Sequence, residues 1–230
     1  MSFIVIDVET VYTEAHKTAV LAEPCPEFKA PSNYKDEAKI AESIAKQKGE
    51  WEAGREQRIA QGALDPRTGR ILCFGAQSIG PLGTHGVTNP AKDEAREVEL
   101  LREFWQLIAE NTGTVVTFNG TFDLRFLLLR SIIQNVKPSL APHAIASWFR
   151  RYSTLSHFDC RAVLNNWDSR EAGTLGDWCK AFGIKHDDSV KGSDIYALYV
   201  KGDFNAITTH CRSDVGATVQ LYSRIAPFYV

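Results

Sequence analysis

An apolar stretch that contains two carboxylates opens the sequence: Phe3-Ile4-Val5-Ile6-Asp7-Val8-Glu9-Thr10. The density of Ile, Val and Phe predicts a buried β-strand over residues 2–8. Asp7 and Glu9 lie two positions apart, so both side chains project from the same face of that strand. Carboxylates on a buried strand are costly unless they are paired or bind a metal ion. The opening strand therefore predicts half of a metal site.

The rest of the chain predicts an α/β fold with a mixed central sheet. We expect further strands at residues 70–79, 84–87 and 114–118, and helices at residues 91–110, 121–135, 141–151, 159–166, 174–182, 193–200 and 203–226. Residues 11–34 contain three prolines and are expected to be irregular. Residues 35–63 predict a long polar helix with few large apolar side chains. We therefore expect a single domain over residues 1–230, with an inserted helical arm at about residues 20–68.

The composition is typical of a globular protein, with 44% hydrophobic and 23% charged residues among 230. No apolar run reaches the roughly 20 residues that a membrane helix needs, and no signal peptide is expected. The five cysteines lack the spacing of a metal or redox motif, which is typical of a reduced cytoplasmic compartment. The net charge of −2 leaves a nucleic-acid partner open, because carboxylates that bind metal can coexist with basic patches.

Two further acidic residues lie where the predicted elements begin or turn. Asp123 ends a turn that follows the strand at residues 114–118, and Asp214 lies on the last helix. His210 is four residues before Asp214, so the two side chains are neighbours on one face of that helix. Four converging carboxylates cannot all stay ionised without cations, and ligation by oxygen alone points to Mg²⁺ or Mn²⁺. Two such ions can activate a water and stabilise the leaving oxygen in phosphoryl displacement.

Three segments, in this order, resemble the exonuclease motifs of the DEDD (DnaQ-like) 3′–5′ exonucleases: residues 7–9, 119–123 and 210–214. The resemblance is in particular to the branch related to the proofreading domain of family B DNA polymerases. Residues 157–161 and 191–215 extend it, and residues 31–66 are similar to an insertion in phage-type members. It implies a ribonuclease H-like fold and a stand-alone, two-metal 3′–5′ exonuclease. Such an enzyme would hydrolyse single-stranded DNA to nucleoside 5′-monophosphates.

The resemblance also implies roles for individual residues. The metal ligands would be Asp7, Glu9, Asp123 and Asp214. The substrate contacts would be Asn119 and Phe122, the latter by stacking on a base, together with the backbone around Thr10 and Val11 beside the 3′-terminal sugar. The resemblance further implies a cytoplasmic protein, encoded by a bacterium or a phage, with a separate polymerase or repair partner.

The residue that handles the attacking water is expected to be His210, because histidine side chains in general titrate near neutrality and suit this role. The polymerase-related branch usually has a tyrosine at this spacing from the last aspartate, and the histidine branch has its histidine one residue earlier. The site is therefore a hybrid of the two patterns. His186 is the rival base, although its place in an expected loop favours a solvated side chain.

The sequence leaves several alternatives open for the function and for individual residues. An exoribonuclease of the same chemistry and a non-catalytic nucleic-acid-binding domain are the alternatives to a DNA exonuclease. Asp123 alone could be a helix cap. We expect Asp159 to cap a helix and His157 to fix a helix start. The arm is expected to be a solvated face, and the alternative is a clamp that touches phosphates through four lysines, Lys35, Lys39, Lys46 and Lys48.

Overall fold

The computed structural model describes residues 2–79, 86–111, 113–168, 170 and 173–229. The chain forms two compact units. The first consists of Met1–Thr10 and Arg70–Val230, and the second of Val11–Gly69. The arm predicted at residues 20–68 lies within the second unit.

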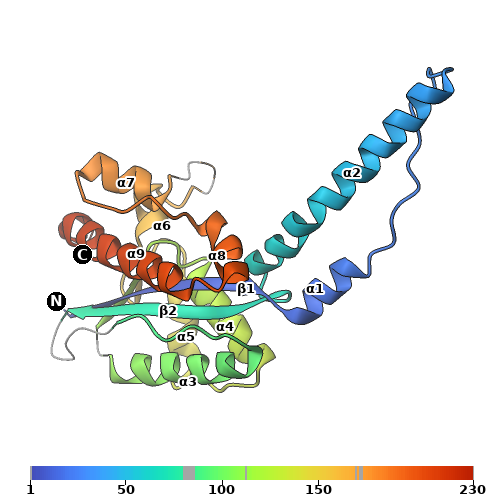
Figure 1. Ribbon diagram of the computed structural model, residues 1–230. Helices are drawn as coiled ribbons and strands as arrows, with labels where there is room; N and C mark the ends of the chain where they lie inside the picture. The colour runs from blue at the N-terminus through green and yellow to red at the C-terminus, as the bar shows by residue number, and fades with distance from the viewer. Residues whose placement is uncertain (1, 80–85, 112, 169, 171–172, 230) are drawn as a thin grey trace. The chain divides into compact units, whose positions relative to one another are not determined.

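A four-stranded sheet in the order β2-β1-β3-β4 forms the centre of the first unit. Its strands are β1 (Phe3–Tyr12), β2 (Gly69–Ile79), β3 (Thr114–Thr117) and β4 (His157–Asp159). β1 pairs in parallel with β3, and β3 pairs in parallel with β4. β2 runs in the opposite direction to β1 (Figure 1). The mixed α/β sheet that the sequence predicts is therefore confirmed.

The strand predicted at residues 84–87 lies partly outside the described residues. Val87, its last residue, forms an isolated antiparallel bridge with Gly75 of β2. The chain then follows β2 further, because the amide of Ala91 donates to the carbonyl of Leu72 over 2.6 Å.

Helices cover both faces of the sheet (Figure 1). They are α3 (Glu94–Glu110), α4 (Asp123–Ile133) and α5 (Pro142–Trp148) on one side, and α6 (Cys160–Leu164), α7 (Leu175–Phe182) and α9 (Phe204–Ile225) on the other; α8 (Ile195–Lys201) precedes α9. Short 3₁₀ turns lie at Gly62–Leu64, Gly192–Asp194 and Ala226–Phe228. None of the helices in the described part of the chain is long and apolar enough to cross a membrane.

The alternation of side chains along β1 assigns its two faces to two separate cores. Ile4 and Ile6 pack in the core that contains α3, α4 and α5. Phe3 and Val5 pack in the core that contains α6, α7 and α9. Residues with odd numbers therefore face α9, and this parity directs Asp7 and Glu9 to the same side.

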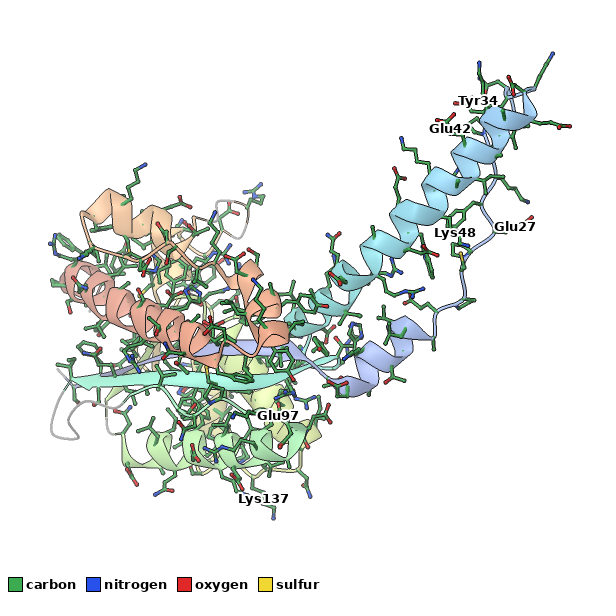
Figure 2. All side chains as sticks on the ribbon, viewed as in Figure 1. Glu27, Tyr34, Glu42, Lys48, Glu97 and Lys137 are labelled. Carbon is green, nitrogen blue, oxygen red and sulfur yellow. The ribbon has the colours of Figure 1, made fainter. Side chains whose placement is uncertain are left out.

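A buried ion pair fixes α4, the helix that begins with Asp123. Glu97 of α3 is fully buried and Arg130 of α4 is 3% exposed. Two guanidinium nitrogens of Arg130 donate to the Glu97 carboxylate over 2.8 and 2.7 Å. The same carboxylate accepts the amide of Ile71 in β2 and the side-chain amide of Gln134. One carboxylate, labelled in Figure 2, thus joins β2, α3 and α4.

The second unit contains two helices, α1 (Glu14–Leu21) and α2 (Glu37–Gln61). The expectation that residues 11–34 are irregular is wrong for α1, because Thr13 caps this helix by accepting the amide of His16, and the prolines come after it. α2 is the long polar helix predicted at residues 35–63, with Ile59 as its only buried residue. Glu42 and Lys48 project from it (Figure 2).

Candidate metal centre

The first half of the candidate site is the pair of acids on β1. Carboxylate oxygens of Asp7 and Glu9 and the sulfur of Cys211 on α9 lie within 4.8 Å of one another. Burial, and then the negative charge of Asp214, raise the pKa of Asp7 from 3.8 to about 8. Burial, followed by the charge of Asp7, also raises the pKa of Glu9 well above its ordinary value. The strand thus presents two carboxyl groups that resist ionisation when no cation is near.

The second half of the candidate site comes from two helices. Asp123 is 5% exposed, and burial followed by the charge of Asp7 raises its pKa well above the ordinary value. Asp214 of α9 contributes its charge to both Asp7 and Glu9. The structure therefore brings the four predicted acids into one electrostatic cluster.

Asp123 does not act as the helix cap that was its alternative reading. The N-cap position of α4 belongs to Phe122, which makes no capping hydrogen bond through its side chain. Asp123 is the first residue of the helix, and its backbone amide donates to the carbonyl of Asn119 over 3.1 Å. The turn that starts at Asn119 thereby sets the position of this carboxylate.

The donor set fits hard divalent cations. Carboxylate oxygens are the ligands that Mg²⁺ and Mn²⁺ prefer. Burial raises the pKa values of Asp7, Glu9 and Asp123, and a bound cation would favour their ionised form. Cys211, which the sequence reading missed, does not alter this fit. A hydrogen bond to Cys73, and then burial, raise the pKa of its thiol well above the ordinary value, so the thiol keeps its proton. Its place three residues before Asp214 on the same helix was the available signal.

His210 lies between two of the acids, and its side chain is 7% exposed. Its Nε2 is 3.7 Å from a Glu9 oxygen, and its Nδ1 is 3.6 Å from Asp214 Oδ1. Both separations are longer than a hydrogen bond, and Nδ1 has no hydrogen-bond partner among the described residues. A buried imidazole nitrogen without a partner is costly, which makes it suited to contact a bound molecule.

A cavity of about 280 Å³ lies beside His210. Its lining is almost wholly polar or small and comes from α9 and the segment that precedes α8: Asp187, Ser189, Val190, Asp203, Asn205, Ala206, Thr209, His210 and Ser213. The imidazole thus lies close to Glu9 and Asp214 and also lines this cavity.

The expectation that His186 is solvated is wrong, because its side chain is 7% exposed. Its Nε2 lies 3.0 Å from Asp214 Oδ1, and its Nδ1 lies 2.7 Å from Asp188 Oδ1. Hydrogen bonds and charge from these two carboxylates outweigh the effect of burial and raise the pKa of His186. The segment between α7 and α8 therefore delivers a second histidine to the cluster.

The structure confirms the role expected of Asp159 but not the role expected of His157. Asp159 does cap α6, since its side chain accepts the amide of Ala162 over 2.8 Å. The expectation that His157 fixes a helix start is wrong. His157 lies in β4, where one ring nitrogen bonds Thr117 Oγ1 and the other bonds the carbonyl of Trp148. Its ring thus links β4 to β3 and to the end of α5.

The residues expected to touch substrate differ in their contacts and exposure. The side chain of Asn119 accepts a hydrogen bond from Thr121 Oγ1 over 2.8 Å, and Phe122 packs on Phe126 with ring centroids 5.4 Å apart. Thr10 and Val11 are 8% and 1% exposed. A contact with substrate at these two positions would therefore involve the backbone, as the resemblance implies.

Comparison with known proteins adds a family to this geometry. Residues 75–229 match a family described as a "predicted 3′–5′ exonuclease related to the exonuclease domain of PolB". The match covers more than half of the chain, so the chain belongs to this family of 3′–5′ exonucleases. The matched segment includes Asp123, His186, His210 and Asp214 and begins after Asp7 and Glu9.

A relative with a similar sequence is the uncharacterized protein MJ0365 of Methanocaldococcus jannaschii. It is 31% identical over 170 residues, which span 69% of this chain and 87% of the relative. Its name assigns no activity.

Proposed function

We propose that the chain is a metal-dependent 3′–5′ exonuclease that removes nucleoside 5′-monophosphates from single-stranded DNA, on a ribonuclease H-like fold. The observation that carries this proposal is the electrostatic cluster of four acids from β1, α4 and α9, three of which have raised pKa values. Membership of a 3′–5′ exonuclease family supports it.

The four carboxylates would hold Mg²⁺ or Mn²⁺. When bound, these ions would activate the attacking water and stabilise the leaving 3′ oxygen. The other roles belong to side chains and backbone of this chain. His210 would hold or deprotonate the attacking water through the ring nitrogen that has no partner among the described residues.

The terminal nucleotide would be bound by two segments. One is the turn before α4, and the other is the part of β1 that follows Glu9. Phe122 would stack on a base, since aromatic faces accept any base. Asn119 would contact the terminal nucleotides, and the backbone at Thr10 and Val11 would border the 3′-terminal sugar. The free thiols of all five cysteines support a reducing, cytoplasmic compartment, in which a separate polymerase or repair protein would be the partner.

Digestion of matched DNA and RNA oligomers tests the proposal. Each oligomer is labelled at its 5′ end and incubated with Mg²⁺, Mn²⁺ or a chelator, and a second set carries the label at the 3′ end. We expect a ladder of 5′-labelled DNA that shortens from the 3′ end, release of labelled monophosphate from the 3′ end, and no cleavage with chelator. Asp7→Asn should abolish both signals.

Three outcomes would contradict the proposal. Preferential degradation of the RNA oligomer would make the chain an exoribonuclease. Cleavage that continues in chelator would remove the metal ions from the mechanism. Binding of DNA without cleavage under any condition would reduce the chain to a nucleic-acid-binding domain.

A further inference from the structure

Asp214 is held by a histidine that lies far from it in sequence. His186 Nε2 bonds Asp214 Oδ1 over 3.0 Å across 28 residues. His210, one helical turn before Asp214, approaches the same oxygen only to 3.6 Å. Of these two imidazoles, His186 is the one that forms a hydrogen bond with this carboxylate.

The orientation of His186 is itself fixed from the other side. Its Nδ1 bonds Asp188 Oδ1 over 2.7 Å, so both ring nitrogens engage a carboxylate. Asp188 lies close against the first turn of α7, where a Cβ on Gly176 would come within 2.6 Å of Asp188 Oδ1. The glycine leaves room for the carboxylate that orients the ring.

A buried imidazole with carboxylates at both nitrogens cannot rotate without losing a hydrogen bond. The side chain of His186 is 7% exposed and that of Asp214 is 19% exposed, so water cannot easily replace the bond between them. The ring of His186 therefore fixes the direction of the Asp214 carboxylate. The position of Asp214 on α9 does not by itself determine that direction.

We infer that His186 is a positioning residue, which presents Asp214 to the metal ions, and that Asp188 holds His186 in the orientation this requires. The inference rests on the proposed function. Residues that hydrogen-bond a metal ligand orient it, and their loss typically lowers metal affinity by about 10- to 100-fold. Because four carboxylates repel one another, a side chain that restrains one of them should matter for metal binding.

Binding of Mn²⁺ to the metal-free protein, followed by electron paramagnetic resonance of the free ion, measures this role without any turnover. The variants are His186→Ala, His186→Gln and His186→Asn. Glutamine places an amide nitrogen near the position of imidazole Nε2 and can still donate to Asp214, whereas asparagine places it near Nδ1 and cannot. Thermal unfolding in chelator verifies that each variant is folded, and His143→Ala, at an exposed histidine of α5, is the matched control.

We expect His186→Ala and His186→Asn to bind Mn²⁺ about 10-fold more weakly, and His186→Gln to recover most of that loss. Asp188→Ala should weaken binding by about 3-fold, and it has little risk of misfolding because this side chain is 68% exposed. If the alanine variant at 186 does not fold, the comparison of glutamine with asparagine and the Asp188 variant decide the question.

Two results would overturn the inference about His186 but leave the proposed function unaffected. One is wild-type affinity in His186→Ala, and the other is recovery by asparagine that equals recovery by glutamine. A wild-type protein that binds no Mn²⁺ and cleaves no DNA would instead overturn the proposed function, and the inference with it. The two failures are therefore distinguishable.

Discussion

The raised pKa of Asp7 makes a quantitative prediction about the metal-free protein. At pH 6.5 the folded protein keeps nearly all of the Asp7 proton and at pH 8 about half of it, because its pKa is about 8, whereas the unfolded chain with an ordinary value of 3.8 has lost it at both. The folded state then binds more protons than the unfolded state, so stability falls as the pH rises. The slope is about 1.4 kcal/mol per pH unit at pH 6.5 and about half of that at pH 8, which gives nearly 2 kcal/mol (about 1.7) over this interval.

The perturbation that isolates this effect is Asp7→Asn, which removes the titrating group. In chelator, Asp7 alone should make the wild-type protein unfold about 4–8 °C lower at pH 8 than at pH 6.5, since about 2 kcal/mol corresponds to that shift in a chain of this size. Glu9 and Asp123 act in the same direction, because their pKa values are raised too. The Asn variant should lose the part of the fall that Asp7 contributes, and it should keep a smaller fall, because burial still raises the pKa values of Glu9 and Asp123.

Calorimetry at the two pH values, in chelator and in excess Mg²⁺, provides the measurement. Mg²⁺ should raise the unfolding temperature of the wild type at pH 8, because a ligand that binds only the folded state stabilises it. The same addition should leave Asp7→Asn nearly unchanged. A wild-type protein whose stability in chelator does not fall between pH 6.5 and pH 8 would refute the reasoning, and so would an Asn variant with the wild-type slope.

Three further substitutions test other parts of the structure. Glu97→Gln removes the negative charge that faces Arg130 and should cost about 3 kcal/mol in guanidinium unfolding; a loss under about 1 kcal/mol would show that the pair is not a determinant of stability. Gly120→Ala directs a Cβ into the ring of His157 and should cost about 1–3 kcal/mol, and wild-type stability would mean that the turn adapts. His210→Ala should slow cleavage by about 100-fold while Mn²⁺ binding persists; an unchanged rate and pH profile would remove it from the mechanism.

Much of the secondary structure could be predicted from the sequence, because its signals are local. Alternation along residues 3–9 indicates both the strand and the shared face of its two acids. The polar helix at residues 35–63 is visible from its charge and its few apolar residues. α1 was missed because the nearby prolines dominate the reading of residues 11–34, although Thr13 supplies an N-cap before the first of them.

The role of His186 could not be predicted, because nothing local indicates its partner. Its contact with Asp214 spans 28 residues and depends on how the segment after α7 returns to α9. His157 was misread for the same reason, since its bond to Thr117 spans 40 residues and joins two strands. The four acids were predictable as a group through a family resemblance, whereas the side chains that orient them depend on tertiary structure.

The sheet order places β1 between β2 and β3, so its backbone is hydrogen-bonded along both edges. Amide groups in such a strand exchange with solvent mainly when the whole domain opens, whereas loop segments open locally and often. His186 lies in a segment without helix or strand. We therefore expect backbone amides around Asp7 to exchange slowly with solvent and those around His186 to exchange fast. Excursions of that loop would release Asp214 while the two acids of β1 stay in place.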